Sequence, residues 1–258
     1  MDKKLILLTN DDGIESEGLY SLYRVLEKDG DFDIRVIAPD KESSAVGHAI
    51  TVFRPISVRK EYREGQFFGY AVDGTPADCV KIANGDILER TPDLLISGIN
   101  RGANMGENII YSGTVSAATE GTTLGITSMA VSVDNLVNPD FIYAASFAKI
   151  IALRVLENGG LPAKTLLNIN IPDVPEDEIK GVVITRQSNA RIKDKFIKRA
   201  DPRGRDYYWM DGEFEGETVD MDTDYCAVKS NYISITPIHY DMTNYEAINY
   251  FKKWDIGK

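Results

Sequence analysis

Two adjacent carboxylates follow the first apolar segment of the chain. Residues 5–9 are largely apolar and lead into Asn10, Asp11, Asp12 and Gly13, after which an amphipathic pattern begins. This order predicts a strand, a tight turn and a helix. Ligands of an open parallel sheet bind at the carboxyl ends of the strands, where this turn would lie. Neighbouring carboxylates repel each other and attract cations, which favours a divalent metal ion, although Asn-Asp-Asp-Gly also suits a plain turn.

Three further polar loops are expected at strand ends, and in a doubly wound sheet they would converge on Asp11 and Asp12. They span residues 38–48, 98–106 and 111–118. Together they offer carboxylate, hydroxyl and amide oxygens, which suit Mg²⁺ or Mn²⁺ rather than zinc. In the third loop, Ser112, Gly113 and Thr114 precede a helical pattern, and a helix N-terminus is a favourable anion site. Each loop taken alone also fits an ordinary turn.

Several other kinds of site are disfavoured. No Gly-x-Gly-x-x-Gly follows the first strand and no Gly-x-x-x-x-Gly-Lys-Ser/Thr is present, which argues against dinucleotide and P-loop sites. Cys79 and Cys226 have no metal-type spacing and are expected to be buried apolar residues. His48 and His239 are the only histidines. Single histidines are more often structural hydrogen-bonding groups than catalysts, so neither is assigned a role.

The elements that would position these residues alternate between strand and helix. Strand patterns fall at residues 5–9, 34–38, 68–72, 94–97, 129–133 and 166–171, and helical patterns at 14–26, from Thr75, at 114–124 and at 141–156. Thr75 can cap a helix whose first position is Pro76. The alternation predicts an α/β fold: a Rossmann-like three-layer core with a mostly parallel sheet over residues 1–172.

The character of the chain changes after residue 172. Strand patterns at 181–185, 207–210 and 232–236 predict a smaller β-rich C-terminal extension over residues 173–258, although one continuous domain also fits. Asp211-Gly212 is a hairpin-turn signal. The basic stretch 186–205 is expected to be a solvated surface loop.

Composition narrows the classes of partner. The 258 residues, 43% of them hydrophobic, allow one large core. The formal net charge of −11 disfavours binding to a nucleic-acid duplex. No apolar stretch approaches the length of a membrane span, and the apolar run near the N-terminus is too short for a signal peptide. We therefore expect a cytoplasmic protein without a membrane partner.

Five motifs in a fixed order carry a family resemblance. They are Thr-Asn-Asp-Asp-Gly (9–13), Ala-Pro-Asp (38–40) with Ser44, Gly-Thr-Pro-Ala-Asp-Cys-Val (74–80), Ser-Gly-Ile-Asn-Arg-Gly-Ala-Asn (97–104) and Tyr-Ser-Gly-Thr-Val-Ser-Ala-Ala (111–118). In this combination the chain closely resembles the SurE family of stationary-phase survival proteins, which are metal-dependent nucleotide phosphatases. The resemblance continues through residues 167–172, 201–204 and 234–239 and so covers almost the whole chain.

The resemblance implies a divalent-metal-dependent phosphatase of nucleoside monophosphates, in which a metal-activated water hydrolyses the phosphomonoester. This would be a 5′-nucleotidase, with 3′-nucleotidase and exopolyphosphatase activities as further options. One Mg²⁺ or Mn²⁺ per subunit would be held by Asp11, Asp12, Ser44 and Asn100, and the two aspartates would also be the catalytic residues. The candidates for the phosphate side of the site are Asn10, Asn104, Ser112, Gly113 and Thr114.

Two further expectations concern the alternative function and assembly. A non-catalytic nucleotide or phosphate sensor would use the same pocket, but the clustered carboxylate, hydroxyl and amide groups favour the enzyme. The resemblance implies a homodimer or homotetramer formed through the C-terminal part. The aromatic segment Tyr207–Phe214 agrees with this, because aromatic residues and methionine are enriched at interface cores.

Overall fold

A nine-stranded sheet forms the centre of the molecule in the computed structural model, which describes residues 3–216, 219–254 and 256. Its strand order is β3-β4-β2-β1-β5-β6-β7-β11-β8. Six strands run parallel to one another: β1 (Lys4–Thr9), β2 (Phe32–Pro39), β4 (Gln66–Val72), β5 (Leu94–Arg101), β6 (Ser128–Val133) and β7 (Thr165–Ile171). At the edges, β3 (Val58–Arg63) is antiparallel to β4, β11 (Ile233–His239) is antiparallel to β7, and β8 (Val182–Ile184) is parallel to β11.

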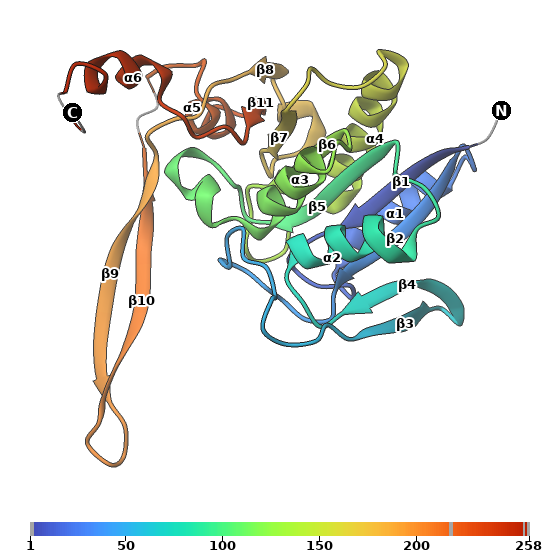
Figure 1. The fold of residues 1–258 in the computed structure, drawn as a ribbon, viewed down its shortest axis with the longest axis horizontal. Helices are drawn as coiled ribbons and strands as arrows, with labels where there is room; N and C mark the ends of the chain where they lie inside the picture. Colours follow the sequence, from blue (N-terminus) through green and yellow to red (C-terminus); the bar gives the residue numbers. More distant parts are fainter. Residues whose placement is uncertain (1–2, 217–218, 255, 257–258) are drawn as a thin grey trace.

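Helices cover both faces of the sheet, because alternate side chains of each buried strand point to opposite faces. On β1, Ile6 and Leu8 pack with the helices α1 (Glu17–Glu27) and α4 (Phe141–Glu157), whereas Leu7 packs with α2 (Pro76–Ile82) and α3 (Gly113–Thr123). Figure 1 shows these layers. The predicted α/β fold with a mostly parallel sheet is therefore confirmed.

Local capping signals begin the helices that matter most for the site. Thr75 accepts a hydrogen bond from the Asp78 amide (3.1 Å) and donates its own amide to the Asp78 carboxylate (2.9 Å), which completes a capping box at the predicted start of α2. Ser112 caps α3 by accepting from the Val115 amide (3.1 Å). The start of α3 is therefore held in place by its own sequence.

An extended two-stranded arm leaves the body of the molecule (Figure 1). It is formed by β9 (Arg191–Ala200) and β10 (Asp206–Glu215), which pair antiparallel over their whole length. Half of the basic stretch 186–205, which was expected to be a loop, therefore belongs to a strand. The prediction of a turn at Asp211-Gly212 is also wrong, because both residues lie inside β10. The chain turns at residues 201–205 instead, where the Asp201 carboxylate accepts from the amides of Arg203 (2.8 Å) and Arg205 (2.9 Å).

Other elements differ from the sequence patterns mainly at their ends. The helix predicted from residue 14 begins at Glu17, and β5 continues beyond residue 97 to Arg101. The sequence patterns missed β3 and α5 (Asp224–Lys229). Short helical turns η1 (Ala83–Ile87), η2 (Gly106–Tyr111) and η3 (Glu176–Glu178) and the terminal helix α6 (Tyr245–Phe251) complete the described chain.

The C-terminal residues take part in the same sheet as the first 172. Strands β8 and β11 extend its edge beyond β7, and only the arm forms a separate sheet. The division into a core and an extension stays a prediction. In the part of the chain that the structure describes, no helix combines the length and apolar character needed to cross a membrane.

Candidate active site

The polar loops that follow β2 and β5, residues 38–48 and 98–106, meet at the carboxyl end of β1. Thr9 of β1 pairs in register with Ser97 of β5. Asp11 lies two residues beyond Thr9, in the loop after β1, and its backbone oxygen accepts a hydrogen bond from the Ser43 amide (2.7 Å). The Asp12 carboxylate accepts from the Arg101 amide (3.2 Å). The loops after three different strands therefore meet around the two aspartates.

Asp11 is the most deeply buried acidic group of this site. Its side chain is only 4% exposed, and its Oδ1 accepts a hydrogen bond from the Thr114 hydroxyl (2.5 Å) at the start of α3. Burial, and to a smaller extent the neighbouring Asp12, raises the pKa of Asp11 to about 6, against the lowering effect of the Thr114 hydrogen bond. The N-terminus of α3 offsets part of the unfavourable free energy of burying the charged carboxylate, because the positive end of a helix favours a carboxylate.

Gly113 allows α3 to approach Asp11 this closely. A Cβ atom at position 113 would lie 2.7 Å from the Asp11 Cβ and 2.8 Å from its Oδ2. Any other residue would therefore push the helix and the carboxylate apart. The sequence predicts Gly113 as a phosphate-side residue because it precedes a helix. In the structure, glycine is required at this position because α3 packs directly against the Asp11 side chain.

A bulge in β5 directs Asn100 toward the same place. The register between β5 and β6 shifts between Ser97 and Asn100, and Gly98 lies at φ +132° with its backbone against Val131. The Asn100 amide nitrogen donates to the backbone oxygens of Arg101 (3.0 Å) and Gly102 (2.7 Å). Its Oδ1 is therefore the side-chain atom left with lone pairs for a cation.

The other predicted ligands are less tightly held. Asp12 is half-buried, and burial raises its pKa, with Glu42 raising it further and Arg101 lowering it. Ser44 is exposed and donates to the Glu42 carboxylate (2.9 Å). Asn10 donates to Gly13 and Ser16, while its Oδ1 is buried without a hydrogen-bond partner among the residues that the structure describes.

The residues predicted for the phosphate side make positioning contacts in this structure. Ser112 caps α3, Thr114 orients Asp11, and Asn104 donates through its backbone to Asn170 (2.7 Å) and through its side chain to Ser132 (2.9 Å). Contact of these residues with phosphate stays a prediction.

A row of polar residues inside the apolar strands holds Asn104 and was missed by the sequence reasoning. Ser132 of β6 and Asn170 of β7 stand at the same level as Asn100 of β5. The side chains of Asn168 and Asn170 donate to the backbone oxygen of Asn104 at 2.8 and 3.0 Å. Polar residues within otherwise apolar strand patterns were the signal that could have found them.

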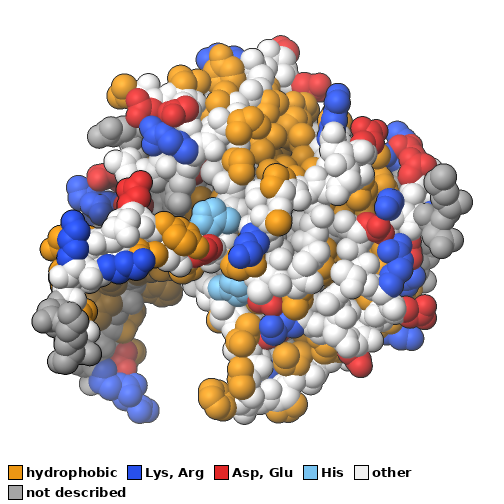
Figure 2. Space-filling view, turned by 45° about the horizontal axis from the view of Figure 1, so that its top comes forward, with side chains coloured by type: hydrophobic (Ala, Val, Ile, Leu, Met, Phe, Trp, Pro, Cys, Tyr) orange, Lys and Arg blue, Asp and Glu red, His pale blue; other side chains and the backbone are white. Residues whose placement is uncertain are grey.

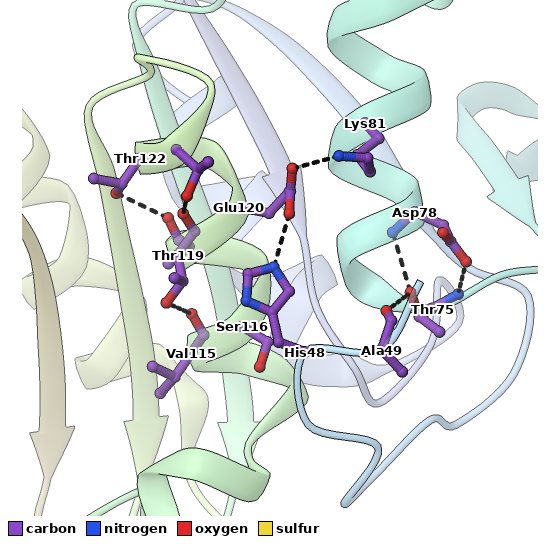
Figure 3. A network of polar contacts seen from close by, with 12 residues as sticks. His48, Ala49, Thr75, Asp78, Lys81, Val115, Ser116, Thr119, Glu120 and Thr122 are labelled. Carbon is purple, nitrogen blue, oxygen red and sulfur yellow. Dashed lines mark hydrogen bonds and ion pairs between the residues drawn. The ribbon is translucent and has the colours of Figure 1, made fainter. Parts of the chain in front are cut away.

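Glu120 is the second group that the sequence reasoning missed (Figure 3). It is 5% exposed in the middle of α3 and accepts from His48 Nε2 (2.7 Å) and from Lys81 Nζ of α2 (2.8 Å). The hydrogen bond from His48 lowers the pKa of Glu120 despite its burial, and Lys81 lowers it further. His48 belongs to the irregular loop 40–57, which also contains Ser44.

This loop is fastened at two further points. The Thr75 hydroxyl donates to the Ala49 backbone oxygen (2.7 Å), and the Thr51 amide donates to the Asp78 carboxylate (2.9 Å). Figure 3 shows Glu120 and the α2 cap on either side of the loop. A segment with no helix or strand of its own is therefore held by α2 and α3.

His239 lies elsewhere in this chain. It ends β11 and pairs with Thr165, the first residue of β7. Thr9 of β1 is level across the sheet with Asn168 of β7, which lies three residues closer to the carboxyl end than Thr165. Asp11 follows the opposite end of β1. The sheet therefore separates His239 from the two aspartates of the same chain.

The donor set fits a hard divalent cation. Within the described residues there is no group of three or more His, Cys, Asp or Glu side chains that would hold a metal ion by themselves. The predicted donor set instead consists of two carboxylates, an amide oxygen and a hydroxyl, and oxygen ligands are typical of Mg²⁺ and Mn²⁺. A cation would also relieve the repulsion between the desolvated carboxylates of Asp11 and Asp12.

Comparison with known proteins gives consistent matches over nearly the whole chain. The family model described as survival protein SurE matches residues 6–194. The 5′-nucleotidase SurE of Syntrophus aciditrophicus is 51% identical over 247 residues, which are 95% of this chain and 92% of that protein. The 5′-nucleotidase SurE of Syntrophobacter fumaroxidans is 47% identical over 251 residues, 97% of this chain and 99% of that protein. The crystal structure of the SurE protein from Aquifex aeolicus is similar with a TM-score of 0.83 and 42% identity, covering 96% of this chain and 98% of that chain.

The first testable consequence concerns the stability of the metal-free protein. The folded-state pKa of Asp11, about 6, is above its ordinary 3.8, so ionisation of Asp11 reduces stability as pH rises through this window. Asp11→Asn removes the charge. We expect it to be more stable than the metal-free wild type at pH 8 by up to about 3 kcal/mol, with the advantage shrinking toward pH 4.

Urea unfolding of both proteins at the two pH values, in the presence of a chelator, measures this difference. Asp177→Asn, which changes an exposed aspartate, is the control and should leave the stability unchanged at both pH values. A wild type that gains stability relative to Asp11→Asn between pH 4 and pH 8 would contradict the assignment.

A second consequence concerns the Glu120 contacts. The lowered pKa of Glu120 means that its charge stabilises the fold above the ordinary value of 4.5, and that this stabilisation is lost as pH falls through the lowered folded-state pKa. Glu120→Gln should therefore lower the free energy of unfolding by about 2 kcal/mol at pH 7, by much less at acidic pH, and should speed proteolysis within residues 40–57.

Equilibrium unfolding and limited proteolysis test this together. Glu17→Gln removes an exposed carboxylate that pairs with Arg63 and serves as the matched control, with an expected effect within about 0.5 kcal/mol. A stability loss in Glu120→Gln that is equal at pH 7 and at acidic pH would show that the charge has no role.

Proposed function

Since the chain belongs to the SurE family, we propose that it is a 5′-nucleotidase: a phosphatase that hydrolyses nucleoside monophosphates with the aid of a divalent cation. Membership in this family implies a divalent metal cofactor in general, and the oxygen-rich donor set supports one Mg²⁺ or Mn²⁺ per subunit. Activity on 3′-nucleotides and on polyphosphate, and a cytoplasmic location, stay predictions.

The observation that carries the proposal is the buried carboxylate of Asp11 against the start of α3. Asp11, Asp12 and the Asn100 Oδ1 supply oxygen donors on one side, and Ser44 lies on the neighbouring loop. The positive end of α3 lies on the other side. Groups that would bind a cation therefore lie next to a helix end that would bind an anion. The hydrolysis of a phosphate ester with a metal ion requires both.

The residues have separate tasks in this proposal. A divalent cation bound here would neutralise phosphate charge and lower the pKa of a water molecule. Asp12 is the better placed of the two aspartates to orient the attacking water, because it is half-exposed whereas Asp11 is buried against Thr114. Asn104, Ser112 and the backbone amides that begin α3 would hold the phosphoryl oxygens. The polar row of Ser132, Asn168 and Asn170 keeps Asn104 in position.

A phosphate-release assay tests the function directly. With adenosine 5′-monophosphate as substrate, we expect hydrolysis with Mg²⁺ or Mn²⁺, loss after chelation and recovery when the cation is added back. Asp12→Asn should lower kcat by at least a hundredfold, because it removes both a ligand and the group that orients water. Asp177→Asn is the control.

Each other outcome of this assay has a defined meaning. Binding of the nucleotide without any phosphate release, in the presence of either cation, would favour a nucleotide sensor over an enzyme. Wild-type turnover in Asp12→Asn would remove Asp12 from the catalytic machinery.

The arm supports a proposal about assembly. Alternate residues of a strand share a face, and the register places Phe196, Tyr208 and Met210 on one face of the arm, where each is more than half exposed. The opposite face pairs Lys193 with Glu213 and Lys195 with Asp211, and further out it pairs Ile197 with Trp209. An isolated two-stranded hairpin is marginally stable in water. We therefore propose that a second copy of this chain covers the apolar face, giving a homodimer or homotetramer.

The two faces of the arm supply a test and its control. Phe196→Ser combined with Met210→Ser changes a cross-strand pair on the apolar face and should convert the oligomer to smaller species in light scattering. Lys195→Ser combined with Asp211→Ser changes a charged cross-strand pair on the opposite face and should leave the assembly intact. A wild-type chain that is monomeric at micromolar concentration would defeat this proposal without affecting the catalytic assignment.

A further inference from the structure

A surface pocket of about 370 Å³ lies between η2 and the base of β9. Ile110 and Tyr111 of η2 form one wall, Arg191, Ile192 and Lys193 form the other, and Asn108 contributes an amide. Figure 2 shows the arm standing away from the body of the molecule, and the pocket lies where the two join. None of the residues that line it belongs to the predicted metal or phosphate site.

The pocket is adjacent to that site. Tyr111 directly precedes Ser112, the cap of α3, and Gly113, which packs against Asp11, is only two residues away. Two residues span no more than about 8 Å between Cα atoms. The Tyr111 backbone oxygen also accepts from the Gly47 amide (3.0 Å), which ties it to the loop that contains Ser44. A molecule whose phosphate lies at the start of α3 can therefore extend into this pocket.

The lining suits an uncharged aromatic group. Ile110, Tyr111 and Ile192 are 61%, 59% and 46% exposed and give the pocket its apolar surface. The charged residues of the lining are two acids and two bases, Glu107, Asp194, Arg191 and Lys193. The cations in the lining are balanced by acids: Arg191 lies 3.9 Å from Glu107, and Lys193 lies 3.2 Å from Glu215. A chain of phosphates would need an excess of positive charge, which this balance does not provide.

Asn108 adds a polar group to the pocket. Its Oδ1 accepts from the Ile192 amide at 3.5 Å, and its Nδ2 is buried with no hydrogen-bond partner within the described part of the chain. A buried donor without a partner is unfavourable, and an acceptor on a bound ligand would satisfy it. Nucleobases offer such acceptors together with a planar face that stacks on aromatic side chains.

We propose that this pocket is the nucleoside subsite, in which the base of a nucleoside monophosphate stacks on Tyr111 while its phosphate lies at the start of α3. The inference rests on the proposed function and specifies how the enzyme distinguishes a nucleotide from other phosphomonoesters. Tyr111 acts in specificity, and the reacting groups are elsewhere.

The test compares two substrates, adenosine 5′-monophosphate and glycerol 2-phosphate, which has no base. In Tyr111→Ala, the ratio of kcat/KM for the nucleotide to kcat/KM for glycerol 2-phosphate should fall about tenfold, mainly through KM for the nucleotide. Tyr111→Phe keeps the aromatic face and should hold the ratio within about twofold. Tyr62→Ala is the matched control, because Tyr62 is 58% exposed on the distant strand β3.

The outcomes separate this inference from the proposed function. An equal loss for both substrates in Tyr111→Ala would overturn the subsite, because it would show an effect through the neighbouring Ser112. Tripolyphosphate is tested as a third substrate, and a loss in Tyr111→Ala that is confined to it would overturn the subsite in favour of a polyanion. If neither substrate is hydrolysed, the proposed function fails, and calorimetry with adenosine 5′-monophosphate then decides the subsite: about tenfold weaker binding to Tyr111→Ala supports it, and unchanged binding overturns it.

Discussion

The contact between the Asp11 carboxylate and the start of α3 is the constraint on which the rest of the site depends. A carboxylate this deeply buried is unfavourable unless it has partners, and here the Thr114 hydroxyl and the positive end of the helix are the partners. The approach is close enough that only glycine fits at position 113. The carboxylate proposed to bind a cation and the helix end proposed to bind an anion are thereby joined into one unit, and each stabilises the arrangement of the other.

Parallel strand order explains why distant polar residues reach this unit. The carboxyl ends of β1, β5, β6 and β7 lie side by side, so one level of the sheet carries Asn100, Ser132 and Asn170 from three strands. These side chains cannot contact water freely inside the sheet, and their hydrogen bonds are used to hold Asn104 and to direct Asn100. The sheet therefore serves both as the apolar core and as the polar support of the site.

Two segments outside the central sheet, loop 40–57 and the arm, lie at the periphery of the site. Loop 40–57 has little regular structure and depends on Glu120 and on the cap of α2 for its position. On another side, the base of the arm is held by Phe214, whose ring stacks on Tyr225 with the ring centroids 5.3 Å apart. The base of the arm and η2 together form the pocket proposed for the nucleoside. If the arm also binds a second copy of the chain, assembly and substrate selection share one element.

The sequence by itself determined the parts of this protein that depend on short-range order. The apolar run before Asp11, the cap at Thr75 and the order of the motifs were enough to predict the α/β fold, the positions of most strands and the family. The tertiary structure alone decided contacts between residues far apart in the chain. Glu120 and His48 are separated by 72 residues, and no local pattern predicts their pairing.

The turn signal at Asp211-Gly212 failed for the same reason. A local preference was overridden by ten cross-strand pairs of the arm, and the chain turns instead ten residues earlier, where the Asp201 carboxylate accepts hydrogen bonds from the turn. Capping and periodicity act over a few residues, whereas burial and pairing energies are set by whichever segments the fold brings into contact.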